Sequence, residues 1–209
     1  MSRTPTTDRA RRTHDRVLAA ALELFNARGT AAVTTNHVAV RAGVSPGNLY
    51  YWFSDKDEIV RLLYAQYVSA YEQLWSGGEA GPLDLAPDEV LARLAGGVEL
   101  SRRYAFLARD LLGLLHADPV LAAEYRTVRE RRLAEFEGLA RVWRTQGVIR
   151  HLDDGTITDL VNALWVIAET WLAFGELDGN HADVEEGTRL LRVVLQPYLT
   201  GEGGRVPQT

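Results

Sequence analysis

The sequence predicts an all-α protein with an amino-terminal three-helix domain and a larger helical domain, about nine helices in all. Three observations carry this prediction. Apolar residues recur at helical spacing along most of the chain, no alternating strand pattern is longer than three or four residues, and glycine or proline stands between most helical segments. The predicted boundaries are 1–54 for the first domain, 55–199 for the second and 200–209 for a disordered tail.

The first helix is predicted over residues 12–27. Its apolar stripe consists of Val17, Leu18, Ala21, Leu22, Leu24 and Phe25. Gly29 follows at a place where helices usually end, because glycine adopts the left-handed conformation easily.

A short second helix fits residues 36–42, with Thr35 as its N-cap. Gly43 can take the left-handed conformation that ends it. Ser45 is a suitable N-cap for a third helix, and a proline follows at the first helical position, where its missing N–H costs nothing. We therefore expect only Gly43 and Val44 to separate the two short helices.

A fourth helix is expected after Ser54, which can cap it, with acidic residues in its first turn. The glycine- and proline-rich segment 76–88 is predicted to be a loop. The remaining helices are expected over residues 90–100, 104–115, 119–146, 156–174 and 183–199. Gly96 and Gly97 could interrupt the first of these five.

Composition excludes several classes of protein and site. Cysteine is absent, which rules out disulfides and thiolate ligands or nucleophiles. No apolar run approaches the roughly 18 residues that span a bilayer, and the polar, arginine-rich amino terminus lacks the apolar core of a secretory signal. We expect a cytoplasmic protein with no membrane partner.

Charge is distributed unevenly along the chain. Residues 1–54 carry seven arginines and three acidic residues, which gives this segment a net charge of +4. The whole chain has a net charge of −5, so the remaining residues carry −9. A basic first quarter on an acidic body indicates that one end meets a polyanion. The alternative is an ordinary fluctuation of surface charge.

The two short helices and their tight, glycine-containing turn predict a helix-turn-helix, whose second helix lies in the DNA major groove. Leu49 and Phe53 are four residues apart and can both face the core, which leaves Asn48, Tyr50 and Tyr51 on the other faces. Amides can bond base edges and hydroxyls can reach phosphates. The alternative is that the run of aromatic residues from 50 to 53 forms the core of a small bundle.

Residues 12–63 resemble the DNA-binding domain of the TetR/AcrR family of bacterial transcriptional regulators. The residues that match the family pattern are Thr34, Thr35, Ala39, Ala42, Gly43, Val44, Ser45, Gly47, Leu49, Tyr50, Phe53 and Lys56. Residues 104–126 are weakly similar to the carboxy-terminal domain of many members. The resemblance implies a cytoplasmic homodimer, associated with the nucleoid when DNA-bound, that reads a palindromic double-stranded operator.

The resemblance also implies roles for single residues. Phosphate contacts are expected from Thr34, Thr35, Ser45, Tyr50 and Lys56, and approach to the bases from Gly47, Asn48 and Tyr51. Asn48 and Tyr51 depart from the residues that the family often has, which affects the operator that is read. Lys56, the single lysine, suits a phosphate because its ammonium acts as a compact point charge. The basic arm at residues 9–12 could add phosphate or minor-groove contacts, or it could be an unstructured tail.

The helix predicted at 156–174 is apolar nearly all round, and the last helix shows the same excess. Such helices need cover on both sides, so we expect them to pair with their copies in a four-helix dimer interface. The predicted interface residues are Leu160, Leu164, Ile167, Trp171, Leu191, Val194, Leu195 and Tyr198. The alternative is two ordinary core helices.

The family resemblance implies an unidentified small-molecule effector that binds in the second domain, residues 55–199. Aromatic walls with few polar groups are typical of ligand sites. The candidate residues are Tyr104, Phe106, Asp110, Trp143, Trp165 and Glu169, and Trp171 could belong to this set too. The aromatic residues could equally be core, and the two carboxylates could form ion pairs with arginines.

The expected function is therefore a DNA-binding transcriptional regulator, a repressor released from its operator by a small ligand. The alternatives are a helical ligand binder that has lost operator binding, or a ligand-independent regulator. An enzyme is not expected, because the sequence has no serine elbow, no glycine-rich phosphate loop and no HExxH motif. We predict no catalytic residue, cofactor or metal site.

Overall fold

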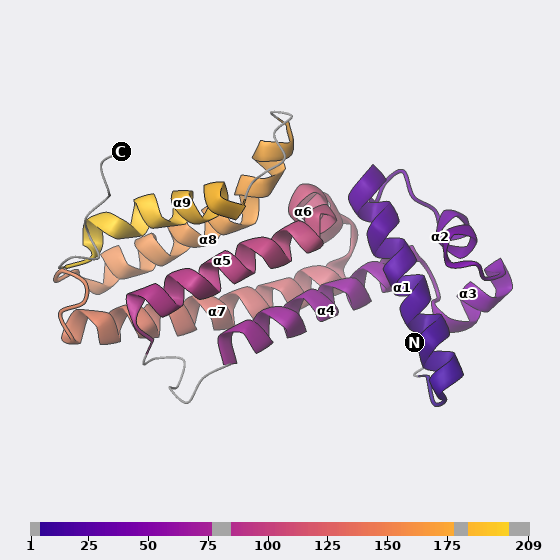
Figure 1. The fold of residues 1–209 in the computed structure, drawn as a ribbon, viewed down its shortest axis with the longest axis horizontal. Helices are drawn as coiled ribbons and strands as arrows, with labels where there is room; N and C mark the ends of the chain where they lie inside the picture. Colours follow the sequence, from indigo (N-terminus) through magenta and orange to yellow (C-terminus); the bar gives the residue numbers. More distant parts are fainter. Residues whose placement is uncertain (1–4, 77–84, 178–183, 201–209) are drawn as a thin grey trace. The chain divides into compact units, whose positions relative to one another are not determined.

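The computed structural model describes residues 5–76, 85–177 and 184–200, and in these residues the protein is all-α, as predicted. Nine α-helices lie in these ranges (Figure 1). Their bounds are α1 Asp8–Arg28, α2 Thr35–Ala42, α3 Pro46–Trp52, α4 Lys56–Ser76, α5 Pro87–Arg103, α6 Ala105–Ala117, α7 Pro119–Thr145, α8 Asp154–Leu177 and α9 Val184–Leu195. A 3₁₀ turn, Gln196–Tyr198, follows α9.

The helices pack as two compact units. Of the described residues, those within 1–69 and 104–122 form the first unit, and those within 70–103 and 123–209 form the second. The first unit is larger than the predicted domain 1–54 because α6 packs against α1. The predicted division into a DNA-binding domain and a ligand-binding domain at residue 54 stays a prediction. Of the predicted tail, 200–209, only residue 200 lies within the described residues.

The core of the first unit is built from α1, α2 and α3, together with side chains of α6 and of the first part of α4. Figure 1 shows the two short helices beside α1. Its fully buried side chains include Val17, Phe25, Val33, Val38, Leu49 and Phe53. Phe25 also packs against Phe106 of α6, with ring centroids 5.4 Å apart. The predicted apolar stripes of α1, α2 and α3 therefore meet in one core.

Two helix starts differ from the prediction. Thr34, not Thr35, caps α2: its hydroxyl accepts from the His37 N–H at 3.3 Å, and His37 Nδ1 accepts from the Thr34 N–H at 3.2 Å. Asp55, not Ser54, caps α4 by accepting from the Glu58 N–H at 2.7 Å. This hydrogen bond is the main cause that lowers the pKa of Asp55. Each cap is one residue from the predicted position.

The loop after α1 is held from two sides by a hydrogen-bonded group that we call the Thr30 clasp, formed by Thr30, Lys56 and Asp110. Thr30 donates its N–H and its hydroxyl to Asp110 Oδ2, each at 2.7 Å. Lys56 Nζ donates to the Thr30 carbonyl at 2.8 Å. Thr30 is buried, so these bonds satisfy polar groups of Thr30 that are largely removed from water.

Helix α6 also covers the carboxy-terminal end of α1. Arg109 donates to the Phe25 carbonyl at 2.7 Å and to the Asn26 carbonyl at 3.2 Å. The Phe106 N–H donates to Asn26 Oδ1 at 3.0 Å. A cationic side chain on the last carbonyls of a helix satisfies groups that have no partner within the helix. These bonds attach the carboxy-terminal end of α1 to α6.

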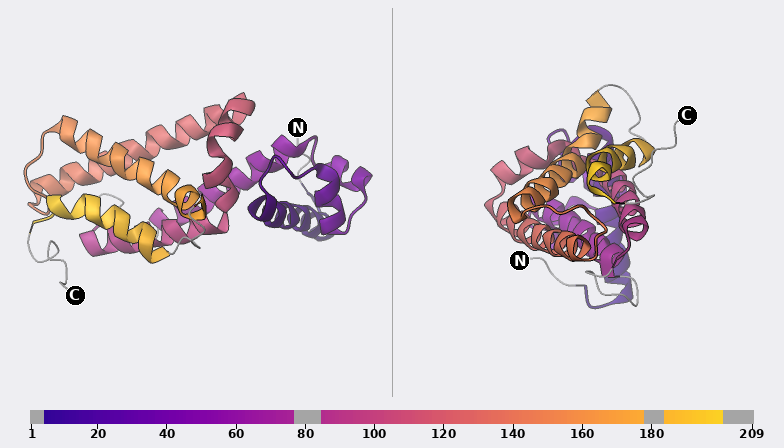
Figure 2. Two further views of the ribbon diagram at one scale, coloured as in Figure 1. Left: turned by 90° about the horizontal axis from the view of Figure 1, so that it is seen from above. Right: turned by 90° about the vertical axis from the view of Figure 1, so that its left-hand side faces the viewer.

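The core of the second unit comes from α4, α5, α7, α8 and α9. Figure 2 shows α8 and α9 running side by side, and the two helices are in contact. The buried cluster contains Trp75, Leu85, Val90, Leu139, Trp143, Ile149, Leu152, Ile157, Leu160, Val161 and Leu195. Trp143 holds the residues just before α5 against this core, because its Nε1 donates to the Leu85 carbonyl at 2.7 Å.

The glycine pair in α5 does not interrupt the helix, contrary to one expectation. A Cβ at Gly96 would lie 2.9 Å from Leu74 Cδ1, and one at Gly97 would lie 3.3 Å from Tyr71 Cε2. The two glycines therefore allow close packing of α5 on α4. Helix α9 ends earlier than predicted, at Leu195, and the 3₁₀ turn that contains Pro197 follows it.

Helix α8 is the most apolar of the described helices. Its segment Asp154–Gly175 is long and apolar enough to cross a membrane, but a core helix of a soluble protein passes the same test. Only 28% of its most apolar 18-residue window is buried within the chain. The exposed large side chains on α8 and α9 include Val166, Phe174, Leu177 and Val193.

The clasp predicts a loss of stability in Asp110→Ala. This change removes the acceptor of the Thr30 N–H and hydroxyl, and an unsatisfied buried donor costs about 1–3 kcal/mol. We expect the free energy of unfolding, measured by urea denaturation with circular dichroism, to fall by that amount. Glu130→Ala is the control because Glu130 is exposed in the middle of α7, away from the helix ends, and it should change stability by less than about 0.5 kcal/mol. Equal losses in the two variants would contradict a stabilising clasp.

Candidate functional site

The turn between α2 and α3 is tight and fully hydrogen-bonded. Gly43 adopts the left-handed conformation at φ 63°, and its N–H donates to the Val40 carbonyl at 3.1 Å. Ser45 caps α3 by accepting from the Asn48 N–H at 3.2 Å. The two helices are thus joined as a helix-turn-helix requires, with Gly43, Val44 and Ser45 between them.

Helix α3 divides its side chains between core and solvent. Leu49 and Phe53 are fully buried, whereas Tyr50 and Tyr51 are 53% and 52% exposed. The exposed positions also include Gly47 and Asn48. The small-bundle alternative is therefore right for Phe53 and wrong for the two tyrosines.

Two of the predicted phosphate-binding residues are joined to each other. The hydroxyl oxygens of Thr35 and Tyr50 lie 2.8 Å apart, which ties α3 to the first turn of α2. Thr34 and Ser45 lie close in sequence to this pair, each at the start of its short helix, with both residues exposed. The structure therefore places four of the predicted hydroxyl groups at the starts of α2 and α3 and on α3 itself.

Lys56 has a structural bond that the sequence did not indicate. Its ammonium is half-buried and donates to the Thr30 carbonyl as part of the clasp. An ammonium has three donors, so this bond leaves capacity for another partner. The predicted phosphate contact of Lys56 stays a prediction.

The predicted ligand residues fall into both units. Tyr104, Phe106 and Asp110 belong to the first unit, where both aromatic rings are buried and Asp110 bonds Thr30. Trp143 is buried in the core of the second unit. That these residues bind a ligand stays a prediction. Their packing agrees with the alternative that they belong to the core.

Glu169 of α8 lies in a polar cluster of the second unit. The Tyr125 hydroxyl of α7 hydrogen-bonds Glu169 and accepts from Trp165 Nε1 at 3.3 Å. Burial raises the pKa of Glu169 to about 7, although the nearby Arg129 and the Tyr125 hydrogen bond oppose the shift. Burial also raises the pKa of Tyr125 to about 12. A carboxyl group in this state can donate or accept a hydrogen bond near neutral pH.

The predicted dimer residues face two environments. Leu160, Trp171, Leu191 and Leu195 are buried within their own unit, while Leu164, Ile167, Val194 and Tyr198 are half-buried. Helical periodicity did not identify the more exposed apolar positions of α8, because this helix is rich in apolar residues on several faces. Helix α9 differs from the expectation, since it is amphipathic and has one distinct apolar face.

Two family descriptions match the chain. "Bacterial regulatory proteins, tetR family" matches residues 17–63, and "Bacterial transcriptional repressor", TetR, matches residues 67–205. The chain belongs to the TetR family of transcriptional regulators. Members of this family bind DNA operators, usually as dimers, so the predicted family and DNA-binding class are confirmed.

Relatives and solved structures agree with the TetR family. The regulator HbdR of Aromatoleum sp. (strain CIB) is 28% identical over 191 residues, which cover 90% of this chain and 81% of HbdR. A TetR-family regulator from Marinobacter aquaeolei VT8 superposes with a TM-score of 0.82 at 28% identity, covering 91% of this chain and 92% of that one. The complex of SmeT with triclosan has the same fold, with a TM-score of 0.65 at 20% identity over 95% and 96% of the chains.

The geometry of α3 predicts that Asn48 and Tyr50 act differently. Asn48→Ala removes an amide suited to base edges and should change the ranking of operator variants, with about 1–3 kcal/mol lost on the preferred sequence. Tyr50→Phe removes a hydroxyl suited to phosphate and should weaken all duplexes by a similar factor. Fluorescence anisotropy on a panel of single-base variants measures both. A uniform loss on every duplex in Asn48→Ala would contradict its base-reading role.

The raised pKa of Glu169 predicts a pH-dependent stability. Its carboxyl ionises near pH 4.5 when unfolded but only near 7 when folded, so the unfolded state releases the proton first. Stability from this group is full below pH 4.5 and is lost as the pH rises through 7, by at most about 1.4 kcal/mol per pH unit.

Urea denaturation between pH 4.5 and 8 tests this. As the pH rises, the free energy of unfolding of wild type should fall relative to that of Glu169→Gln, because only wild type loses the proton-linked stability. Glu130→Gln, at an exposed position of α7, should follow wild type. If Glu169→Gln also follows wild type over this range, the shift in pKa is refuted.

Proposed function

We propose that the protein is a homodimeric repressor that binds a palindromic operator through α2 and α3 and is released by a small molecule. The observation that carries the proposal is the exposure of Asn48, Tyr50 and Tyr51 on a helix that is anchored by the fully buried Leu49 and Phe53. A helix with polar and aromatic residues outward and an apolar anchor inward is suited to the major groove.

In this proposal the contacts divide by chemistry. Thr34, Thr35, Ser45, Tyr50 and Lys56 bind phosphates and set the position of α3 on the duplex. Gly47 has no side chain, so the backbone of α3 approaches the bases beside Asn48 and Tyr51. We call the DNA-binding unit of each protomer its head. The head of the second protomer reads the other half of the palindrome.

The dimer contact is proposed on α8 and α9. Exposed Val166 and Phe174 on α8 and Val193 on α9 support it, since large apolar side chains in water favour a partner. A second copy of the same two helices supplies a matching apolar surface in an isologous four-helix contact. The protein then acts in the cytoplasm, associated with the nucleoid when bound.

The effector is proposed to bind in the second unit. SmeT, the repressor of a Stenotrophomonas maltophilia multidrug efflux pump, shares the fold and has been solved with triclosan. In this chain, Tyr125, Trp165 and Glu169 combine aromatic surface with hydrogen-bonding groups, which is the usual composition of a small-molecule site.

Selection of bound duplexes from a random pool tests operator binding, and salt titration of the selected duplex tests its physical basis. We expect a palindrome to be enriched, and the dissociation constant to rise about 100-fold or more between 50 and 200 mM salt, because neutralised phosphates release counterions. A chain with no enriched sequence and no measurable affinity for DNA would be a ligand binder without operator binding, and the proposal would fail.

A further inference from the structure

A groove of about 640 Å³ lies in the first unit between the amino-terminal part of α1 and the start of α3. We call it the α1 groove. Its lining residues are Arg9, Arg12, Thr13, Arg16, Gly43, Val44, Ser45 and Asn48. Three are arginines and none is acidic, so the groove is strongly basic.

The three arginines share one face of α1. Thr7 caps this helix by accepting from the Ala10 N–H at 3.2 Å, so residues 9–12 are helical and not an unstructured tail. Helical spacing of three and four residues places Arg9, Arg12 and Arg16 in one row. The sequence showed the basic cluster, but only the helix brings Arg16 into line with it.

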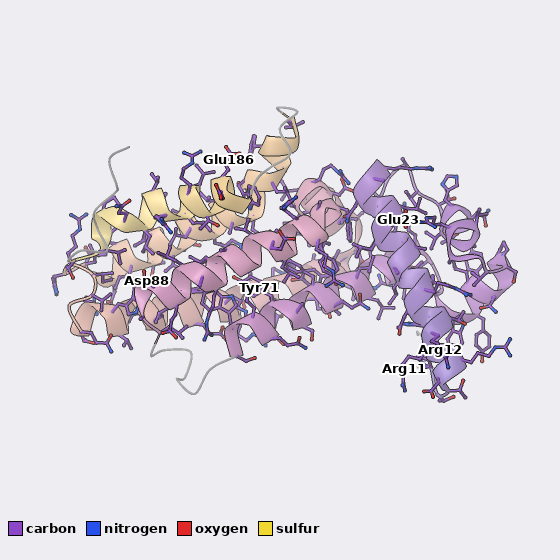
Figure 3. All side chains as sticks on the ribbon, viewed as in Figure 1. Arg11, Arg12, Glu23, Tyr71, Asp88 and Glu186 are labelled. Carbon is purple, nitrogen blue, oxygen red and sulfur yellow. The ribbon has the colours of Figure 1, made fainter. Side chains whose placement is uncertain are left out.

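The arginines of this row are free of acidic partners. In the described part of the chain, Arg9, Arg12 and Arg16 make no ion pair, and the Arg12 Nε donates to the Asp8 carbonyl at 3.4 Å. Arg11 differs, because it does not line the groove and pairs with Asp8 at 3.5 Å. Figure 3 labels Arg11 and Arg12 at the amino-terminal end of α1.

The opposite wall of the groove belongs to the helix-turn-helix. Ser45 and Asn48 line it, and both are among the DNA-contacting residues of the proposed function. A guanidinium is always charged and its planar fork matches a phosphate with two parallel hydrogen bonds. An unpaired arginine row beside a DNA-reading helix is therefore suited to a polyphosphate backbone that runs along the groove.

We propose that the α1 groove holds a stretch of the DNA sugar–phosphate backbone, which makes α1 a second DNA-contacting element of each head. Arg12 and Arg16 bind successive phosphates of one strand while α3 lies in the major groove. This inference rests on the proposed function, since it assumes that α3 meets DNA. The contact adds affinity and salt dependence and carries no direct information on base sequence.

The test compares two double variants that remove the same charge from the same helix. Arg12→Gln with Arg16→Gln removes two groove residues, and Arg11→Gln with Arg28→Gln removes two exposed arginines that do not line the groove. Glutamine keeps a helix propensity close to that of arginine. Fluorescence anisotropy with the selected duplex and with unrelated duplexes gives affinity from 50 to 300 mM salt.

For the groove variant we expect the slope of log affinity against log salt to fall by about 1.8 per head, since each phosphate contact contributes about 0.9. Binding should weaken by at least about tenfold on every duplex, with their ranking unchanged. The control variant should change the slope by less than about 0.5 per head. Equal changes in both variants would overturn the proposal and indicate a general field of positive charge.

Two further outcomes separate the possible failures. If wild type binds no duplex, the proposed function fails. If wild type binds and the groove variant behaves as wild type, the α1 groove is not a backbone site and α3 alone contacts DNA. Inorganic phosphate is also added at constant ionic strength. Phosphate binding that is lost in the groove variant, and that displaces no DNA from wild type, would assign the groove to free phosphate and overturn the backbone contact.

Discussion

The arrangement of the first unit depends on the Thr30 clasp. All three polar groups of the Thr30 backbone and side chain are used: the N–H and hydroxyl bond Asp110, and the carbonyl accepts from Lys56. The same short loop therefore connects the end of α1 with the start of α4 and with α6. Because an unsatisfied buried polar group is costly, the three elements cannot separate there without a penalty.

The clasp gives the helix-turn-helix a fixed support. Arg109 and Asn26 bind the end of α1 to α6 beside the clasp, and the apolar core anchors Leu49 and Phe53 under α3. The exposed face of α3 is thus held by packing and hydrogen bonds that exist without DNA. Preorganisation of this kind lowers the ordering entropy that binding must overcome.

Sequence periodicity predicted the all-α fold, the helix-turn-helix and the burial of Leu49 and Phe53, because these features depend on local spacing. The cap of α3, Ser45, was predicted correctly, whereas the caps of α2 and α4 were each misplaced by one position, since neighbouring Thr34 and Thr35, or Ser54 and Asp55, can serve as caps by chemistry alone. The bonds of Thr30 to Lys56 and Asp110 join residues 26 and 80 positions apart, and no local pattern encodes such pairs. Glu169 was named from the sequence as a candidate ligand residue, but its bond to Tyr125 depends on how α7 and α8 are placed in the fold.

The paired hydroxyls of Thr35 and Tyr50 have a consequence for proton donation. Either oxygen can be the donor across the 2.8 Å contact, and whichever one donates, the other keeps a hydrogen that is free to point outward. The pair therefore offers one outward O–H at either of two sites, on α2 or on α3, without breaking its internal bond. Rotation of two hydroxyls is enough to move that donor while the helices stay still, so in the proposed complex the pair can bind a phosphate from either helix.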